Sequence, residues 1–138
     1  PIVHEFKPDL RLIVSRHEGT ISDEQFICAY EQLFRNSRFD PASNRIIDLR
    51  KTDSTQRTAS ALALIAQKLR DYYRNFPEAP NTALIAPSTH SFGAGRIFGR
   101  LAQGVPGKVK VFRDCPSALE WLRIPFDAVD IIQSLQTE

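Results

Sequence analysis

The sequence predicts an α/β fold, with a mixed, mainly parallel sheet of about five strands and helices packed against it. Short apolar runs alternate with longer stretches in which apolar residues recur every three or four positions. Strands that alternate with helices in this way imply right-handed crossovers between parallel strands. The 138 residues, of which 42% are hydrophobic and 25% charged, are typical of one globular domain. We therefore expect a single domain over residues 1–138, with the element order ββαβαβαβα.

The chain begins with two expected strands, residues 2–6 and 10–16. The turn-forming residues Lys7-Pro8-Asp9 separate them. In the second strand, apolar residues alternate with polar ones apart from one lapse at Ile13. We expect this hairpin to form the antiparallel start of the sheet.

The first helix is expected at Asp23–Arg35. Ser22 and Gln25 have the spacing of a capping box, in which each residue satisfies a backbone N–H of the other. Ile21 and Phe26 occupy the two positions of a hydrophobic staple. The start of this helix is the best-defined boundary in the sequence.

The remaining elements alternate between buried strands and amphipathic helices. They are a strand at 45–49, a helix that starts between Ser54 and Thr58 and ends before Pro77, a strand at 82–86, a helix at about 91–103, a strand at 109–112 and a short helix from Asp114 to Leu122. A last amphipathic helix is expected at about 126–136.

The net charge of +2 conceals an uneven distribution of charge. Residues 35–113 hold fourteen Lys or Arg against five Asp or Glu, whereas both ends are acidic. Such a segment favours an anionic neighbour, which could be a phosphate, a lipid head group, an acidic protein or the molecule's own ends. The sequence has two cysteines, no secretory signal pattern and no apolar run near the roughly 18–20 residues that span a bilayer. We therefore expect a cytoplasmic protein with no integral membrane segment.

Three segments carry a resemblance to a known family. They are Arg45-Ile46-Ile47-Asp48-Leu49-Arg50, the helix start Ser91-Phe92-Gly93-Ala94-Gly95-Arg96-Ile97-Phe98, and Val111-Phe112-Arg113-Asp114 followed by Ala118-Leu119-Glu120-Trp121-Leu122. Together with the element order, they make residues 10–122 resemble the STAS family, which includes the bacterial anti-sigma-factor antagonists. More closely, the chain is similar to the small stand-alone bacterial proteins grouped as STAS-like or CRAL-TRIO-like. The resemblance implies the STAS fold and a binding or regulatory module that is not an enzyme.

Asp53, Ser54 and Thr55 form a candidate partner loop or phosphorylation site. In the antagonist branch that the chain resembles, a partner kinase phosphorylates a Ser in an Asp-Ser pair at the start of the second helix, and Asp53-Ser54 looks like that position. Ser54 and Thr55 also suit a helix N-cap, because the first backbone N–H groups of a helix have no internal partner. Both interpretations stay open at this point.

A second candidate site lies in the glycine-containing segment around Arg96. The glycines follow a strand and open a helix, where backbone N–H groups and the helix dipole can hold an anion. Their spacing fits neither a dinucleotide-binding motif nor a P-loop, so close packing of the helix on the sheet through Gly95 and Gly99 is the competing explanation. Arg96 and Arg100, with Gly93 and Gly95, are the candidate anion or ligand residues.

Other chemistries find little support in the sequence. The histidines have no metal-ligand spacing, and no carboxylate pair or nucleophile motif is visible. The basic residues lack the interleaved aromatic residues of single-strand binders. We expect no catalytic residue, no metal, no cofactor and no nucleic-acid partner.

Two functions of different classes remain. The first is a non-enzymatic STAS-like module that binds a protein partner through the 53–55 loop and the basic centre. The second is a carrier or sensor of a small apolar or lipid-like ligand, held between the sheet and movable helices, with Arg96 as its anion-binding residue. The apolar stripe within residues 128–135 could line such a cavity, cover it or join two protomers as a homodimer.

Overall fold

The computed structural model describes residues 1–76, 80–125, 127, 128 and 135. One five-stranded sheet has the order β1-β2-β3-β4-β5, so each strand lies beside the next strand in the sequence. The elements in chain order are β1 (Ile2–Lys7), the 3₁₀ helix η1 (Pro8–Leu10), β2 (Leu12–Thr20), α1 (Asp23–Arg35), β3 (Asn44–Asp53), α2 (Ala59–Tyr73), β4 (Thr82–Ile85), α3 (Thr89–Leu101), β5 (Val109–Phe112) and α4 (Cys115–Trp121).

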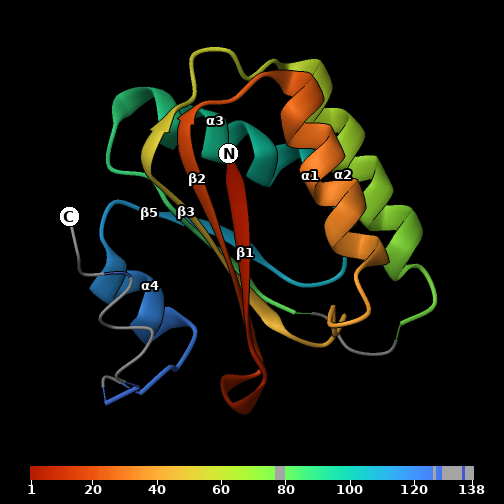
Figure 1. Ribbon diagram of the computed structural model, residues 1–138, viewed down its shortest axis with the longest axis vertical. Helices are drawn as coiled ribbons and strands as arrows, with labels where there is room; N and C mark the ends of the chain where they lie inside the picture. The colour runs from red at the N-terminus through yellow and green to blue at the C-terminus, as the bar shows by residue number, and fades with distance from the viewer. Residues whose placement is uncertain (77–79, 126, 129–134, 136–138) are drawn as a thin grey trace.

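The strand directions confirm the predicted mixed sheet. β1 pairs with β2 in the antiparallel direction, and β2, β3, β4 and β5 are parallel to one another. The helices α1, α2 and α3 connect successive parallel strands. Because every crossover is expected to be right-handed and moves to the next strand in the same direction, all three helices belong on one face of the sheet. Figure 1 shows α1 and α2 on one side of the sheet and α4 on the other.

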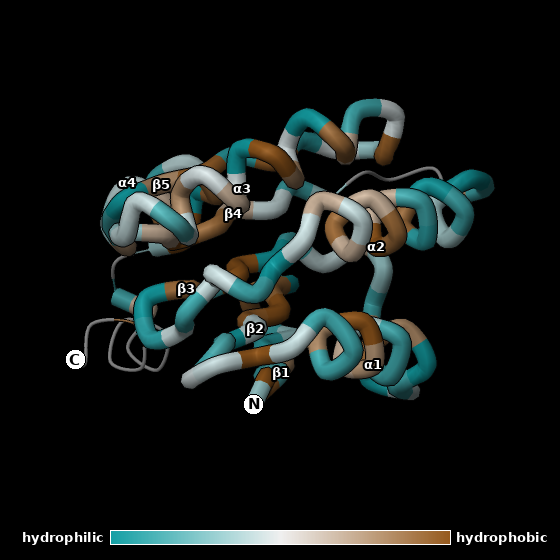
Figure 2. The backbone as a smooth tube through the Cα atoms, turned by 90° about the horizontal axis from the view of Figure 1, so that it is seen from above, coloured by the Kyte–Doolittle hydropathy of each residue, from teal (hydrophilic) through white to brown (hydrophobic). Residues whose placement is uncertain are grey.

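The two faces of the sheet bury separate clusters of apolar side chains. Ile13 faces the helices α1, α2 and α3, whereas its neighbours Leu12 and Val14 face α4. This alternation is the period of two that successive strand residues must show. Figure 2 shows hydrophobic stretches in the inner strands and hydrophilic stretches at the outer ends of α1 and α2.

The helix starts test the predicted caps. The Ser22 capping box of α1 is present, and the Asp114 side chain accepts a hydrogen bond at the start of α4. The predicted capping role of Ser54 and Thr55 is wrong, because α2 begins at Ala59 and Thr58 is its N-cap. β3 runs past its expected end to Asp53, since it continues to pair with the long β2, and this delays the start of α2.

The expected C-terminal helix at 126–136 lies largely outside the described residues. Leu135 is described, and it is fully buried in the cluster beneath α4, with Ala128 packed against the same cluster. Within the described part of the chain, no helix has both the length and the apolar character needed to cross a membrane.

Candidate functional site

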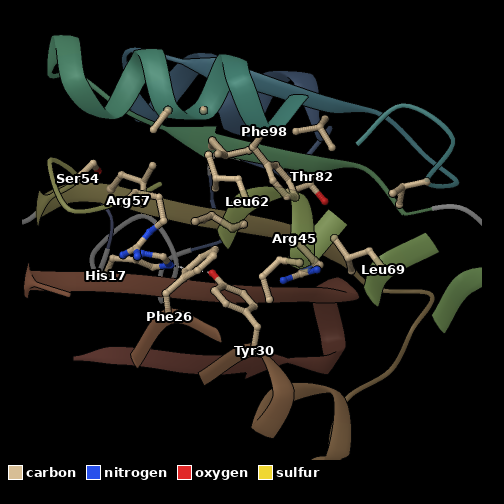
Figure 3. Close-up of a pocket in the computed structure, with 18 of the residues that line it drawn as sticks. His17, Phe26, Tyr30, Arg45, Ser54, Arg57, Leu62, Leu69, Thr82 and Phe98 are labelled. Carbon is tan, nitrogen blue, oxygen red and sulfur yellow. Dashed lines mark hydrogen bonds between the residues drawn. The ribbon is translucent and has the colours of Figure 1, made fainter. Parts of the chain in front are cut away.

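A cavity lies between the sheet and the helices α1, α2 and α3 (Figure 3). It offers about 70 Å³ to the centres of water-sized molecules. One water needs only about 10–15 Å³ on this measure, so the cavity has room for several waters or a short apolar chain. Most of its wall is apolar, with Leu62 of α2, Phe98 of α3 and Ile47 of β3 among the lining residues. The cavity is the candidate functional site.

Strand β3 supplies one long wall of the cavity. Arg45, Ile47 and Leu49 are spaced two residues apart, so their side chains share the face that the helices cover. Figure 3 shows Arg45 and Leu69 toward one end, and His17 and Arg57 toward the other. The wall therefore places one charged side chain in line with two apolar ones.

His17 and Tyr30 form an uncharged polar pair in the wall. Nε2 of His17 and the hydroxyl of Tyr30 share a hydrogen bond of 2.7 Å. Burial lowers the pKa of His17 to about 3, with a further contribution from the charge of Arg57. Burial also raises the pKa of Tyr30 to about 12. Both side chains are therefore neutral at pH 7.

Arg57 has its charge compensated by helix α1. Its Nη1 donates to Oδ1 of Asp23 at 2.7 Å, and its Nη2 donates to the carbonyl oxygen of Ile21 at 3.0 Å. The hydroxyl of Thr58 donates to Oδ2 of Asp23 at 2.7 Å. Burial opposes ionisation of Asp23, but the hydrogen bonds from Thr58 and Arg57 outweigh it and lower its pKa. Asp23, at the start of α1, thus forms an ion pair with Arg57 and a hydrogen bond with Thr58, the N-cap of α2.

Arg45 is a buried cation that no anion among the described residues compensates. The residue is 4% exposed, and its Nε is shielded from solvent with no hydrogen-bond acceptor in the described part of the chain. Its guanidinium carbon lies 5.6 Å from the ring centre of Tyr30 and 6.0 Å from that of Phe34. These are the outer distances of a cation–π contact, which compensates a buried charge only in part.

Buried charges elsewhere in the described residues are paired. On the opposite face of β3, Asp48 is 5% exposed and accepts hydrogen bonds of 3.0 Å from both Nε and Nη2 of Arg50. Arg45 differs from Asp48 and from Arg57 in this respect. A polar side chain that is buried and unpaired in a cavity wall is a mark of a ligand site.

The amino end of the parallel strands forms the Arg45 end of the cavity. The backbone N–H of Arg45 donates to the carbonyl of Asn81, and that of Thr82 donates to the carbonyl of Lys108. Thr82 is the partner of Arg45 in the ladder between β3 and β4. Thr82, the exposed Lys108 and the buried Pro80 all line the cavity. This end therefore combines a buried cation, a hydroxyl and an exposed ammonium group.

The predicted 53–55 loop lies at the other end of the cavity. Ser54 lines the cavity, and its hydroxyl shares a hydrogen bond of 2.8 Å with the hydroxyl of the fully buried Ser91. Asp53 and Thr55 are exposed, and Oδ1 of Asp53 accepts from the backbone N–H of Thr55 at 2.9 Å. The loop thus has an outward side and one residue that reaches the cavity. Its role in phosphorylation or partner binding stays a prediction.

Helix α3 separates the residues of the second predicted site. Gly95 is buried and lines the cavity, whereas Gly93, Arg96 and Arg100 are exposed and lie outside the cavity wall. A methyl group on Gly95 would lie 3.0 Å from Cγ2 of Val111, so the predicted close packing is present there. At Gly99 a methyl group would meet nothing within 4 Å, so the packing explanation is wrong for that residue. An anion site at Arg96 and Arg100 stays a prediction.

Sequence reasoning missed Arg45 as a site residue. Arg45 was expected only to begin a strand and to form part of the segment that resembles the STAS family. The available signal was the alternation of β3, because a residue two positions before Ile47 and four before Leu49 shares their buried face. A charged residue on a face that must be buried indicates a ligand or a counter-ion.

Metal chemistry has no candidate site in the described residues, and the buried thiol of Cys115 is a poor nucleophile. No group of three or more His, Cys, Asp or Glu side chains gathers there in a way that could hold a metal ion. Cys115, the first residue of α4, is buried, and this burial raises the pKa of its thiol. A raised pKa leaves little of the reactive thiolate.

The fold is the SpoIIAA-like, or STAS-like, fold, and the predicted resemblance is confirmed at this level. The chain is similar to the crystal structure of an uncharacterised DUF3478 family protein with a SpoIIAA-like fold from Shewanella loihica PV-4. The TM-score is 0.53 at 20% sequence identity, over 88% of this chain and 92% of that chain. No family model and no curated protein matches the sequence. The likeness shows the fold, so function has to be argued from the cavity.

Proposed function

We propose that this chain is a non-enzymatic STAS-like module that binds a small, mainly apolar ligand between the sheet and the helices α1, α2 and α3. The observation that carries the proposal is the cavity of about 70 Å³ with its largely apolar wall. Side chains in protein interiors normally fill such space, because every unfilled contact loses attraction between atoms. Apolar walls also hold water poorly. An apolar ligand that fills the cavity would restore the missing contacts between atoms, and it would suit the apolar wall better than water does.

A second function, the binding of a protein partner through the 53–55 loop, is compatible with the first. It is supported by the exposure of Asp53 and Thr55 together with the contact between Ser54 and Ser91 at the cavity. A ligand near Ser54 would change the surroundings of that hydroxyl pair. The loop could then report occupancy of the cavity to a partner, as a regulatory module requires.

A methyl NMR titration with octan-1-ol tests the ligand-binding proposal. We expect saturable shifts of the methyl groups of Leu62, Ile65 and Leu84, which line the cavity. Ala94→Phe should abolish these shifts, because Ala94 also lines the cavity and a phenyl group would fill it. The control variant is Ala59→Phe, because Ala59 is exposed at the first position of α2. Shifts confined to surface methyl groups, or no saturable shift at all, would contradict the proposal.

A further inference from the structure

We infer that the ligand of this cavity is a carboxylic acid with an apolar body, bound as its monoanion, and that Arg45 binds its carboxylate. The inference rests on the proposed function and extends it by naming the chemical class of the ligand. In this inference the carboxylate is bound by Arg45 in the cavity wall and not by Arg96 or Arg100, which are exposed on α3.

The first argument is the uncompensated charge of Arg45. The residue is 4% exposed, and its Nε has no acceptor among the described residues. A guanidinium stays protonated in proteins, so it cannot escape this situation by losing its charge. The other cavity arginine, Arg57, has Asp23 at 2.7 Å. An anion supplied by a ligand would give Arg45 the partner that Asp23 gives to Arg57.

The described wall of the cavity also contains no acidic side chain, since none of the described residues that line it is an Asp or a Glu. Tyr30 and Tyr73, the nearby hydroxyl groups with acidic protons, stay protonated because burial raises the pKa of each to about 12. The hydroxyl of Tyr73 already donates to the carbonyl oxygen of Pro41 at 3.0 Å. The described wall therefore supplies a positive charge to the cavity and no negative charge to balance it.

The third argument is the order of side chains along β3. Arg45 stands at the start of the strand, and the apolar Ile47 and Leu49 follow on the same face. An elongated ligand with its anionic head at Arg45 would place its apolar body beside these two residues. The exposed Lys108 lines the same end, so an approaching anion meets a second positive charge there. The positive end of the cavity thus matches the anionic head of a small amphiphile, and the apolar wall matches its hydrocarbon body.

A carboxylate fits this site better than a phosphate. The planar guanidinium can donate two parallel hydrogen bonds to the two oxygens of a carboxylate. One buried positive charge balances one negative charge. A phosphate monoester carries nearly two negative charges at neutral pH, so its second charge would lack a buried counter-charge, because Lys108 at the same end is exposed to solvent.

Isothermal titration calorimetry with octanoate and octan-1-ol tests the inference, since the two probes share a chain length and differ in charge. We expect the wild-type chain to bind octanoate about tenfold to a hundredfold more tightly than octan-1-ol, the range typical of a hydrogen-bonded charge. Arg45→Met should remove this preference and keep the binding of octan-1-ol. Arg96→Met is the matched control, because Arg96 is exposed on α3, and it should leave the preference unchanged.

Stability measurements keep the test independent of folding. Because Arg45 has no counter-ion within the described part of the chain, replacing it with Met should leave the ligand-free chain at least as resistant to urea as the wild type. If Arg45→Met fails to fold, Arg45→Lys serves instead, since it keeps the charge but loses the paired donors, and it should bind octanoate more weakly than the wild type does.

The possible results separate the two claims. Equal binding of octanoate and octan-1-ol to the wild type, or a preference that survives Arg45→Met, would overturn the assignment of Arg45 and leave the apolar cavity proposal standing. No binding of either probe would overturn both claims.

Discussion

Burial keeps His17 uncharged in the folded protein over the pH range in which a free imidazole titrates. It is 5% exposed and bonded to Tyr30, and burial lowers its pKa from 6.5 to about 3. In the unfolded chain the same imidazole takes up a proton as the pH falls through 6.5. Below that pH the unfolded state therefore binds more protons than the folded state. The contribution of His17 to the free energy of unfolding is therefore fully present above pH 6.5, and it is lost as the pH falls from 6.5 to about 3.

The pH dependence of unfolding should show this effect. We predict that the free energy of unfolding of the wild type falls by about 1.4 kcal/mol per pH unit below pH 6.5 owing to His17 alone. His17→Gln keeps a polar group near Tyr30 but has no titrating ring, so its stability should fall less steeply over the same range. Urea denaturation between pH 7 and pH 5 checks the difference in slope. An identical slope in the two proteins would show that folding does not lower the pKa of His17.

The sequence and the structure differ most at the scale of single residues. The capping box at Ser22 was predictable because its two residues interact within one turn of helix. Arg45 was not singled out, because its role depends on which residues of α1 and β4 lie opposite it and on their failure to supply a carboxylate. Arg96 was singled out because residues 79–113 contain basic side chains and no acidic ones. That composition does not show which side of α3 faces solvent, and Arg96 is exposed.

At the scale of elements, helix α3 offers a matched pair of glycines. Any Cβ at Gly95 would meet Val111 and Leu84 at 3.0 to 3.4 Å, whereas a Cβ at Gly99 would enter open space. We predict that Gly99→Ala raises the free energy of unfolding by about 0.5–1 kcal/mol, since Ala forms helix better than Gly. Gly95→Val should lower it by about 1–3 kcal/mol through overpacking against β5.

Thermal or urea unfolding of both glycine variants measures this prediction. The two changes lie one helical turn apart in the same helix, so a general effect of altering α3 would move both variants in the same direction. A stable Gly95→Val protein would mean that α3 can move away from β5 at little cost. That result would also weaken the account of a fixed cavity wall.

Most element boundaries were predictable from local patterns. Asp23–Arg35 and Val109–Phe112 match the expected ranges, because caps and apolar runs mark their ends within a few residues. The start of α2 was predicted only to lie between Ser54 and Thr58, and the structure has its N-cap at Thr58, the last of these residues, because β3 continues to Asp53 in pairing with β2. The hydroxyl of Thr52 donates to the carbonyl of Gly19 at 2.8 Å, and this contact joins positions 33 residues apart. No pattern confined to residues 50–58 contains that information.

At the scale of the whole molecule, chain topology determines where a cavity can form. Three successive crossovers in the same direction place α1, α2 and α3 on one face of the sheet. α2 and α3 are joined at one end by Arg70, whose Nη1 donates to the carbonyl oxygen of Leu101 at 2.7 Å. α1 and α2 are joined at their starts through Asp23. These contacts connect the helices near their ends, and the cavity lies between those contacts and the sheet.

The element order and the mixed sheet could be predicted because they follow from the succession of strand and helix patterns. The cavity could not be predicted, since its existence depends on small differences in side-chain volume across all the strands and helices that line it. The basic centre of the sequence illustrates the same limit. In the structure Arg45 is buried in the cavity wall, whereas Arg96 and Arg100 are exposed on α3, and composition cannot separate the two kinds.

A crystal structure of the chain grown with octanoate would show whether Arg45 binds the carboxylate of an apolar acid. We expect a carboxylate with its oxygens about 2.7–2.9 Å from the guanidinium nitrogens of Arg45. We also expect an alkyl chain beside Ile47 and Leu49, within the space bounded by Leu62 and Phe98. Octanoate bound only at the protein surface, with the cavity empty or filled by water, would contradict the account.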